Sequence, residues 1–163
     1  MKQNRETRDL LIRPVRAEDA PNVHRTCWPE QPLDKVLTLL QRAEKLRKGR
    51  RGLGVVALRA EEVYGFGMLT LWPRAAEISD LVVNARFRGQ GVGTAIIQFL
   101  TEAARDLNAT VLEIGVALSN TRALALYRRL GFHDYRTIQV DLGQGPEPVL
   151  YLEKELSPQH SHA

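Results

Sequence analysis

Apolar and polar residues follow each other along this chain with a period that changes several times. An apolar run at 10–15 predicts a first strand, and apolar residues spaced three and four apart at 33–48 predict an amphipathic helix. Short apolar runs at 55–58 and 63–72 flank a polar stretch at 59–62, which is the pattern of a β-hairpin. The first half of the chain therefore predicts a strand, helical structure and then a hairpin.

The second half alternates between the two periods. In order, the pattern predicts a strand at 76–83, a helix after Gly91, a strand at 111–116, a helix from Thr121 to Gly131 and two strands near 137–140 and 149–152. Gly131 is the residue type that ends a helix in a left-handed conformation. Strands and helices that follow one another in this order predict an α+β or mixed α/β domain.

Composition places the chain among soluble globular proteins. It has 163 residues, of which 44% are hydrophobic and 26% charged, so we assign one domain to residues 10–156 with flexible ends at 1–9 and 157–163. No apolar run is long enough to span a membrane, and we expect no signal peptide and no membrane partner. The lone Cys27 excludes an internal disulfide and is typical of a reducing compartment, which predicts a cytoplasmic protein.

The charge is mildly positive, at a net +4. Basic residues gather at the end of the predicted helix, namely Arg42, Lys45, Arg47, Lys48, Arg50 and Arg51. They are either solvated cations that complement a helix dipole or a patch that attracts an anionic ligand. No nucleic-acid-binding motif accompanies them, so no nucleic-acid partner is expected. His160 and His162 lack further ligands, so no metal site is predicted.

One glycine-rich segment carries the most specific chemistry. An apolar strand at 76–83 passes through a short basic turn into Gly89, Gly91 and Gly93 and then directly into a helix. The first turn of a helix leaves backbone N–H groups unpaired, and the helix dipole adds partial positive charge there. Glycines at that point let the backbone approach an anion closely, so the segment predicts a phosphate-binding loop.

The spacing of these glycines argues against two common phosphate-binding motifs. A dinucleotide fingerprint requires G-x-G-x-x-G and an acidic residue about 20 positions later. A P-loop requires Gly-Lys followed by Ser or Thr, and Gly93-Thr94 lacks the lysine. A dinucleotide-dependent enzyme is therefore disfavoured.

Two motifs resemble the GNAT N-acetyltransferase superfamily. Its acyl-CoA signature Q/R-x-x-G-x-G/A is matched by Arg88, Gly91 and Gly93. A later pattern, N-x-x-A-x-x-x-Y-x-x-x-G-F, is matched by Asn120, Ala123, Tyr127, Gly131 and Phe132. With the order of elements, the resemblance covers most of the chain. It implies the GNAT fold, an α+β domain whose twisted, mostly antiparallel central sheet is flanked by helices.

The resemblance also implies a function. Members of this superfamily use acetyl-CoA as a co-substrate, need no metal, and transfer the acetyl group directly to an amine in a ternary complex. We therefore expect a primary amine of a small molecule or peptide as the acceptor, which the sequence does not identify. Homodimers are frequent in such families. The alternative is a module on the same fold that binds acyl-CoA without catalysis.

Roles for individual residues follow from the same resemblance. The loop N–H groups would hold the pyrophosphate of coenzyme A, the N–H of Val83 would contact the thioester carbonyl, and the main chain of Leu81 and Val83 would line the pantetheine arm. Asn120 would contact the cofactor, cap its helix, or do both. The predicted cofactor-binding residues are Leu81, Val82, Val83, Arg88, Gly89, Gln90, Gly91, Val92, Gly93, Thr94 and Asn120.

Acetyl transfer to an amine needs a base and an acid, and the sequence offers candidates for both. A lysine-like amine costs about 4–5 kcal/mol to deprotonate at neutral pH, and an α-amine costs about 1 kcal/mol, so a base is useful. Glu77 is the candidate base, with Asp80 as the weaker alternative; either is otherwise an ordinary carboxylate in a strand. Tyr127 stands where the family has its general acid, although its helical position also suits the core. Period-two alternation predicts that Glu77, Ser79, Leu81 and Val83 share one face of the strand.

Overall fold

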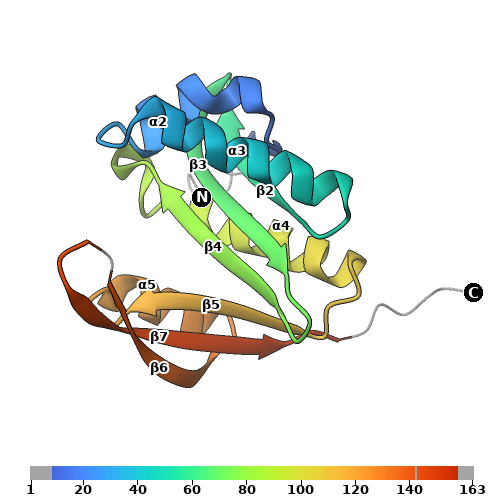
Figure 1. The fold of residues 1–163 in the computed structure, drawn as a ribbon, viewed down its shortest axis with the longest axis vertical. Coiled ribbons are helices and arrows are strands. Elements are labelled where there is room, and N and C mark those ends of the chain that lie inside the picture. The colour runs from blue at the N-terminus through green and yellow to red at the C-terminus, as the bar shows by residue number, and fades with distance from the viewer. Residues whose placement is uncertain (1–8, 142, 158–163) are drawn as a thin grey trace, which may run out of the picture.

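The computed structural model describes residues 9–141 and 143–157 (Figure 1). In chain order the elements are β1 (Leu11–Pro14), the 3-10 turn η1 (Ala17–Asp19), α2 (Ala20–Cys27), α3 (Leu33–Lys48), β2 (Gly52–Arg59), β3 (Glu62–Leu71), β4 (Ala76–Val83), the 3-10 turn η2 (Ala85–Phe87), α4 (Val92–Asp106), β5 (Val111–Ala117), α5 (Thr121–Arg129), β6 (His133–Asp141) and β7 (Pro146–Glu155). Apart from Asp9 and Ser157, the predicted flexible ends lie outside the described residues.

The predicted α+β class is confirmed. Within the described ranges, seven strands form one sheet in the order β1-β2-β3-β4-β5-β7-β6, and every neighbouring pair is antiparallel except β4 with β5. The helix at 33–48 and the strand at 76–83 have the predicted bounds. The last two strands are longer than predicted, because the backbone ladder between β6 and β7 extends well beyond the apolar residues that mark them.

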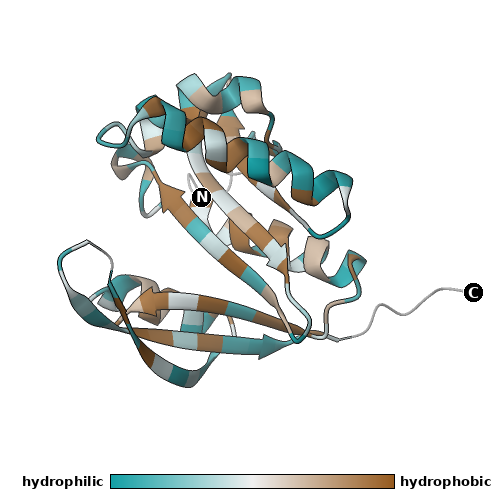
Figure 2. Ribbon diagram, in the orientation of Figure 1, coloured by the Kyte–Doolittle hydropathy of each residue, from teal (hydrophilic) through white to brown (hydrophobic). Residues whose placement is uncertain are grey.

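Helices cover the two faces of the sheet unequally. On one face, α2 and α3 pack over β2 and β3, around the fully buried Leu40 and Phe66. On the other face, α4 and α5 pack over a larger core that includes Ile96, Leu112 and Leu152. Figure 2 shows mainly hydrophobic residues on the central strands and many hydrophilic ones along α3. In Figure 1 the half of the sheet formed by β5, β7 and β6 lies below α2 and α3, with α5 behind it. None of the described helices covers the face of this half that is turned toward the viewer.

The parallel contact between β4 and β5 is short. It joins three residue pairs, which are Ala76 with Leu112, Glu77 with Glu113 and Ile78 with Ile114. Beyond Ile78 the two strands separate, while β4 stays paired with β3 and β5 stays paired with β7. The sheet therefore opens in its middle, and the separated end of β4 leads into the glycine-rich loop.

Strand β4 changes the direction of its side chains near its midpoint. Asp80 has a φ of 53°, and the register with β3 shifts opposite Gly67, so a bulge interrupts the alternation. Before the bulge Ile78 packs into the α4–α5 core, and after it Leu81 and Val83 pack there instead. The prediction that Leu81 and Val83 share the face of Glu77 is therefore wrong, because it assumed an unbroken strand.

Glycine in β3 allows α4 to lie close to the sheet. A Cβ atom on Gly67 would lie 2.6 Å from Cγ2 of Ile96 and 3.2 Å from Cδ1 of Leu100, both on α4. Such distances are too short for carbon atoms, so helix and strand would have to move apart. The close contact holds the first turn of α4 beside the end of β4.

We predict that Gly67→Ala lowers the free energy of unfolding by about 1–3 kcal/mol, the usual cost of overpacking a core. Urea denaturation of the purified variant measures this change. Gly49→Ala is the control, since a Cβ there would meet its nearest atom, the Lys45 carbonyl oxygen, at an ordinary 3.5 Å. Equal stability of the Gly67→Ala variant and the wild type would contradict the close packing of α4 on β3.

Candidate functional site

The glycine-rich loop ends in a helix terminus with free hydrogen-bond donors. Gly91 is the N-cap of α4 and has a φ of 81°, a left-handed conformation that glycine adopts without strain. In the part of the chain that the structure describes, no protein group accepts a hydrogen bond from the N–H groups of Val92, Gly93 or Thr94. Three adjacent unpaired donors at the positive end of a 15-residue helix can bind a phosphate group.

One side of the glycine-rich loop packs against the protein core, and the other side is exposed to solvent. Phe87 is buried and stacks on Tyr64 with ring centroids 3.6 Å apart. The Asn84 side chain donates 2.8 Å to the Thr26 carbonyl oxygen and accepts from the Arg86 N–H. Arg88, Gly89, Gln90 and Gly91 are exposed. Anchoring on the core side leaves the basic, glycine-rich side free for a ligand.

Helix α5 reaches the same place from the other half of the sheet. A Cβ on Gly93 would lie 3.6 Å from Cγ2 of Val83 and 4.0 Å from Cδ2 of Leu126. The first turn of α4 therefore lies between the end of β4 and α5. The structure brings the two sequence motifs together beside the opening between β4 and β5.

The residues of the second motif have clear structural roles. The side chain of Asn120 accepts a hydrogen bond of 3.2 Å from the Ala123 N–H, so the predicted capping role is confirmed. Tyr127 is buried in the α4–α5 core, and burial raises the pKa of its phenol. Its hydroxyl has no hydrogen-bond partner among the described residues. A protonated, unpaired phenol is able to donate a proton to a nearby anion.

The predicted cofactor-binding residues differ in what they can offer. Val92 is buried, so only its backbone is available, whereas Gly93 and Thr94 are partly exposed. Leu81, Val82 and Val83 are also partly exposed. Beyond Ile78 no residue of β4 pairs with β5, so the β4 edge next to the opening is free to pair with an extended ligand.

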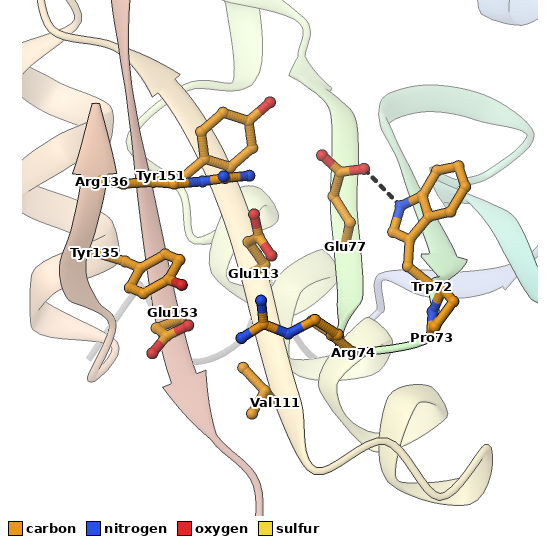
Figure 3. Close-up of a pocket in the computed structure, with 11 residues that line it drawn as sticks. Trp72, Pro73, Arg74, Glu77, Val111, Glu113, Tyr135, Arg136, Tyr151 and Glu153 are labelled. Atoms are coloured by element: carbon orange, nitrogen blue, oxygen red, sulfur yellow. Dashed lines mark hydrogen bonds between the residues drawn. The ribbon is translucent and has the colours of Figure 1, made fainter. Parts of the chain in front are cut away.

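A cavity of about 590 Å³ lies where β4 and β5 still pair, on the face that α4 and α5 do not cover (Figure 3). Glu77 lies in its wall, and one of its carboxylate oxygens accepts a hydrogen bond of 3.0 Å from the indole N–H of Trp72. Trp72 is 50% exposed and Tyr135 is 48% exposed, so aromatic rings border the cavity. The cavity combines carboxylates with aromatic surface, which suits a ligand carrying a positive charge.

Glu113 also lines this cavity and was missed by the sequence reasoning. It is the cross-strand partner of Glu77 on β5, and Glu153 is its partner on β7, so three carboxylates form a row across three strands. The available signal was one charged residue, Glu113, in an otherwise apolar strand. The pairing itself is non-local and could not be read from that signal.

The row of carboxylates shifts proton affinities in the cavity. Burial, and then the negative charge of Glu77, raise the pKa of Glu113; Arg136 and Arg74 oppose the shift, and Glu153 adds to it. Burial, and then the charges of Glu77 and Glu113, raise the pKa of Tyr151. The row of carboxylates therefore raises the proton affinity of both Glu113 and Tyr151, although two arginines line the same cavity.

Other candidate groups do not assemble into a site. Cys27 is buried, burial raises its pKa to about 11, and its nearest polar contact is the Thr26 hydroxyl at 3.7 Å. Among the described residues, no group of three or more His, Cys, Asp or Glu side chains could hold a metal ion, and no helix is long and apolar enough to cross a membrane. His160 and His162 lie outside the described residues.

The two tryptophans and the basic cluster also have assignable places. Trp28 packs edge-on against Phe66 at 5.4 Å, whereas Trp72 lines the cavity. Lys45, Arg47 and Lys48 occupy the last turn of α3, which agrees with cations complementing a helix dipole.

Comparison with known proteins agrees with this geometry. The sequence model of the acetyltransferase (GNAT) family matches residues 17–132. An uncharacterized N-acetyltransferase of Methanocaldococcus jannaschii is 36% identical over 64 residues, or 39% of this chain and 28% of that protein. A thialysine N-epsilon-acetyltransferase of Bos taurus is 36% identical over 72 residues, or 44% of this chain and 42% of that protein. The chain thus spans less than half the length of these two relatives.

A solved structure extends the similarity to the whole fold. A protein of Salmonella typhimurium named as a putative acetyltransferase, whose structure includes its cofactor acetyl-CoA, superposes with a TM-score of 0.73 at 18% identity. The match covers 94% of this chain and 96% of that one. At this identity the likeness establishes the shared fold. The superposed region therefore includes the strands on both sides of the opening between β4 and β5.

The raised pKa of Glu113 predicts a pH-dependent stability. Because the folded state binds this proton more tightly than the unfolded state, the free energy of unfolding falls as the pH rises from the unfolded-state pKa through the folded-state pKa. Glu113→Gln removes the charge, so its Tm should exceed that of the wild type at about pH 8, and the difference should vanish at about pH 3, where Glu113 is protonated.

Thermal unfolding followed by circular dichroism at both pH values measures this effect. Glu61→Gln is the matched control, because Glu61 lies in the exposed turn between β2 and β3, at the far end of β3 from Trp72. A Glu113→Gln variant with the wild-type Tm at both pH values would show that the Glu113 carboxylate carries no electrostatic cost.

Proposed function

The chain belongs to the acetyltransferase (GNAT) family, and from that premise we propose that it transfers the acetyl group of acetyl-CoA to a primary amine of a small molecule or peptide. The observation that carries the proposal is the set of unpaired N–H groups of Val92, Gly93 and Thr94, next to the opening between β4 and β5. A helix N-terminus for a pyrophosphate beside a free strand edge for an extended amide chain matches the two chemical parts of coenzyme A.

In this proposal the loop and β4 bind the co-substrate. The loop N–H groups and Arg88 hold the pyrophosphate, and the main chain of Leu81, Val82 and Val83 pairs with the pantetheine arm. The Val83 N–H polarises the thioester carbonyl, an interaction that strengthens as negative charge develops on that oxygen. Asn120 supports the site by capping the helix that carries Tyr127.

The reaction needs two proton transfers. Glu77 accepts a proton from the ammonium group of the acceptor, and the neutral amine then attacks the thioester carbonyl carbon. The C–N bond forms, the C–S bond breaks, and Tyr127 donates its phenolic proton to the departing thiolate. Burial, which raises the pKa of Tyr127, keeps this proton in place until the thiolate appears.

Direct transfer without an acyl-enzyme intermediate fits the only thiol of the chain. Cys27 is buried, its pKa is raised to about 11, and no basic side chain contacts its sulfur in the described part of the protein. Such a thiol is a poor nucleophile at neutral pH. A cytoplasmic location is proposed with this activity, because a single free thiol suits a reducing compartment.

We predict that acetyl-CoA and coenzyme A raise the thermal midpoint and that NADH does not. A ligand present at 100 times its dissociation constant stabilises the folded state by about 2.7 kcal/mol. Gly91→Ala should abolish the shift, because alanine disfavours the left-handed φ of 81° that shapes the loop. Gly145→Ala is the control, since Gly145 has a similar φ of 93° in the turn between β6 and β7. No shift in the wild type would remove the basis of the proposal.

We also predict turnover with at least one amine in a panel read by release of the coenzyme A thiol. The panel contains thialysine, because the bovine relative is named for it, and a peptide with a free α-amine, which is the easier amine to deprotonate. Glu77→Gln and Tyr127→Phe should each lower kcat about 100-fold or more while the acetyl-CoA thermal shift is retained. Binding without turnover of any amine would favour the non-catalytic acyl-CoA-binding module.

A further inference from the structure

Glu77 does not stand alone in the cavity. It forms the middle pair of the short β4–β5 contact with Glu113, and neighbouring strands lie about 4.8 Å apart. Both side chains line the cavity, and Figure 3 shows both carboxylates pointing into it. Two carboxylates held this close in a partly buried site repel each other when both are ionised.

The two carboxylates have different partners. One carboxylate oxygen of Glu77 accepts a hydrogen bond of 3.0 Å from the indole N–H of Trp72. The side chain of Glu113 has neither a hydrogen bond nor an ion pair within the described residues. Because only Glu77 has a hydrogen-bond donor beside it, we assign the negative charge to Glu77 and the proton to Glu113.

The surrounding charges keep this asymmetry. From β7, Glu153 and Tyr151 face Glu113, and Glu153 makes the site more negative. From β6, Arg136 opposes this charge, but its guanidinium lies over the rings of Tyr135 and Tyr151, 5.9 and 5.6 Å from their centroids. Arg74, in the turn before β4, is the second opposing cation. Neither arginine forms an ion pair with a carboxylate of the row in the described structure.

We propose that Glu77 and Glu113 act as one base that takes up a single proton from the acceptor amine, and that this proton resides on Glu113. The inference rests on the proposed function and names a residue that the family resemblance did not. An N–H bond of the ammonium breaks and an O–H bond forms on the carboxyl pair. Glu77 accepts the proton from the ammonium group and passes it to Glu113, so Glu77 is again a carboxylate and the amine is neutral. The proton leaves Glu113 for solvent after acetyl transfer.

Pairing makes the base stronger than either carboxylate alone. An isolated glutamate ionises well below neutral pH and is a weak acceptor for an ammonium proton. When the first proton relieves the repulsion between two carboxylates, the proton affinity of the pair rises toward the working pH. Catalysis by a base is most efficient there.

A titration of the glutamate carboxyl carbons by NMR tests the pair without any acceptor. Glu113 should titrate at higher pH than a glutamate in an unfolded peptide, and Glu77→Gln should move the Glu113 transition to lower pH. Glu61→Gln, which removes a charge from the distant β2–β3 turn, should leave it in place. An identical Glu113 transition in the wild type and in Glu77→Gln would overturn the proposal, because the carboxylates would then be uncoupled.

The pH dependence of kcat/KM tests the role in the reaction, with the amine that the panel identifies. In Glu113→Gln the acidic limb should move to lower pH, since the repulsion between the two carboxylates is then absent, and kcat/KM at neutral pH should fall about 10-fold or more. Glu113→Asp should restore part of kcat/KM and move the acidic limb back toward its wild-type pH. Glu61→Gln should behave as the wild type. An unchanged limb and rate in Glu113→Gln would overturn the proposal.

The outcomes separate this inference from the proposed function. A wild type that binds acetyl-CoA and acetylates an amine, with Glu113→Gln unaffected, would leave the function standing and remove the pair. A wild type without an acetyl-CoA thermal shift would remove the function, while the NMR titration would still decide whether the carboxylates are coupled.

Discussion

The three-residue contact between β4 and β5 is the constraint on which the rest of the site depends. A parallel ladder that continued past Ile78 would close the sheet and pair the β4 edge that now lies free. A shorter contact would not place Glu77 beside Glu113. The ladder thus brings carboxylates together where the strands pair and leaves a gap where they separate. The positive end of α4 lies beside that gap.

The bulge at Asp80 divides β4 into two parts with different roles. Before it, Glu77 faces the cavity; after it, Leu81 and Val83 pack into the α4–α5 core. A regular strand would have directed Glu77 and Leu81 to one face and put an apolar side chain into the charged cavity. A left-handed φ at a residue other than glycine has a cost, so the bulge is kept only because the structure around Asp80 favours it.

Local sequence signals predicted the elements, and non-local pairing explains what they missed. The helix at 33–48 and the strand at 76–83 follow from periodicity alone, because one face of each is buried. The loop could be predicted because its chemistry is contained in seven consecutive residues, 88–94. Glu113 could not, since its meaning depends on which residue of another strand lies beside it. The prediction that Leu81 lies on the same face as Glu77 was wrong, because the spacing of apolar residues does not reveal a bulge.

The gap between β4 and β5 also connects the two faces of the sheet. Glu77 and Glu113 line the cavity on the uncovered face, and Tyr127 lies in the α4–α5 core on the opposite face. In the proposed reaction a proton therefore enters the protein on one face and another leaves from the opposite face, and the sheet itself separates acid from base. Burial raises the pKa of both Glu113 and Tyr127, and the two shifts have different consequences because one group acts as a base and the other as an acid. It strengthens the carboxyl pair as a proton acceptor, and it holds the phenol protonated until the thiolate forms. Transfer of the phenolic proton to the thiolate, whose acid has a pKa of about 8.5, is uphill and depends on the proximity of the two groups.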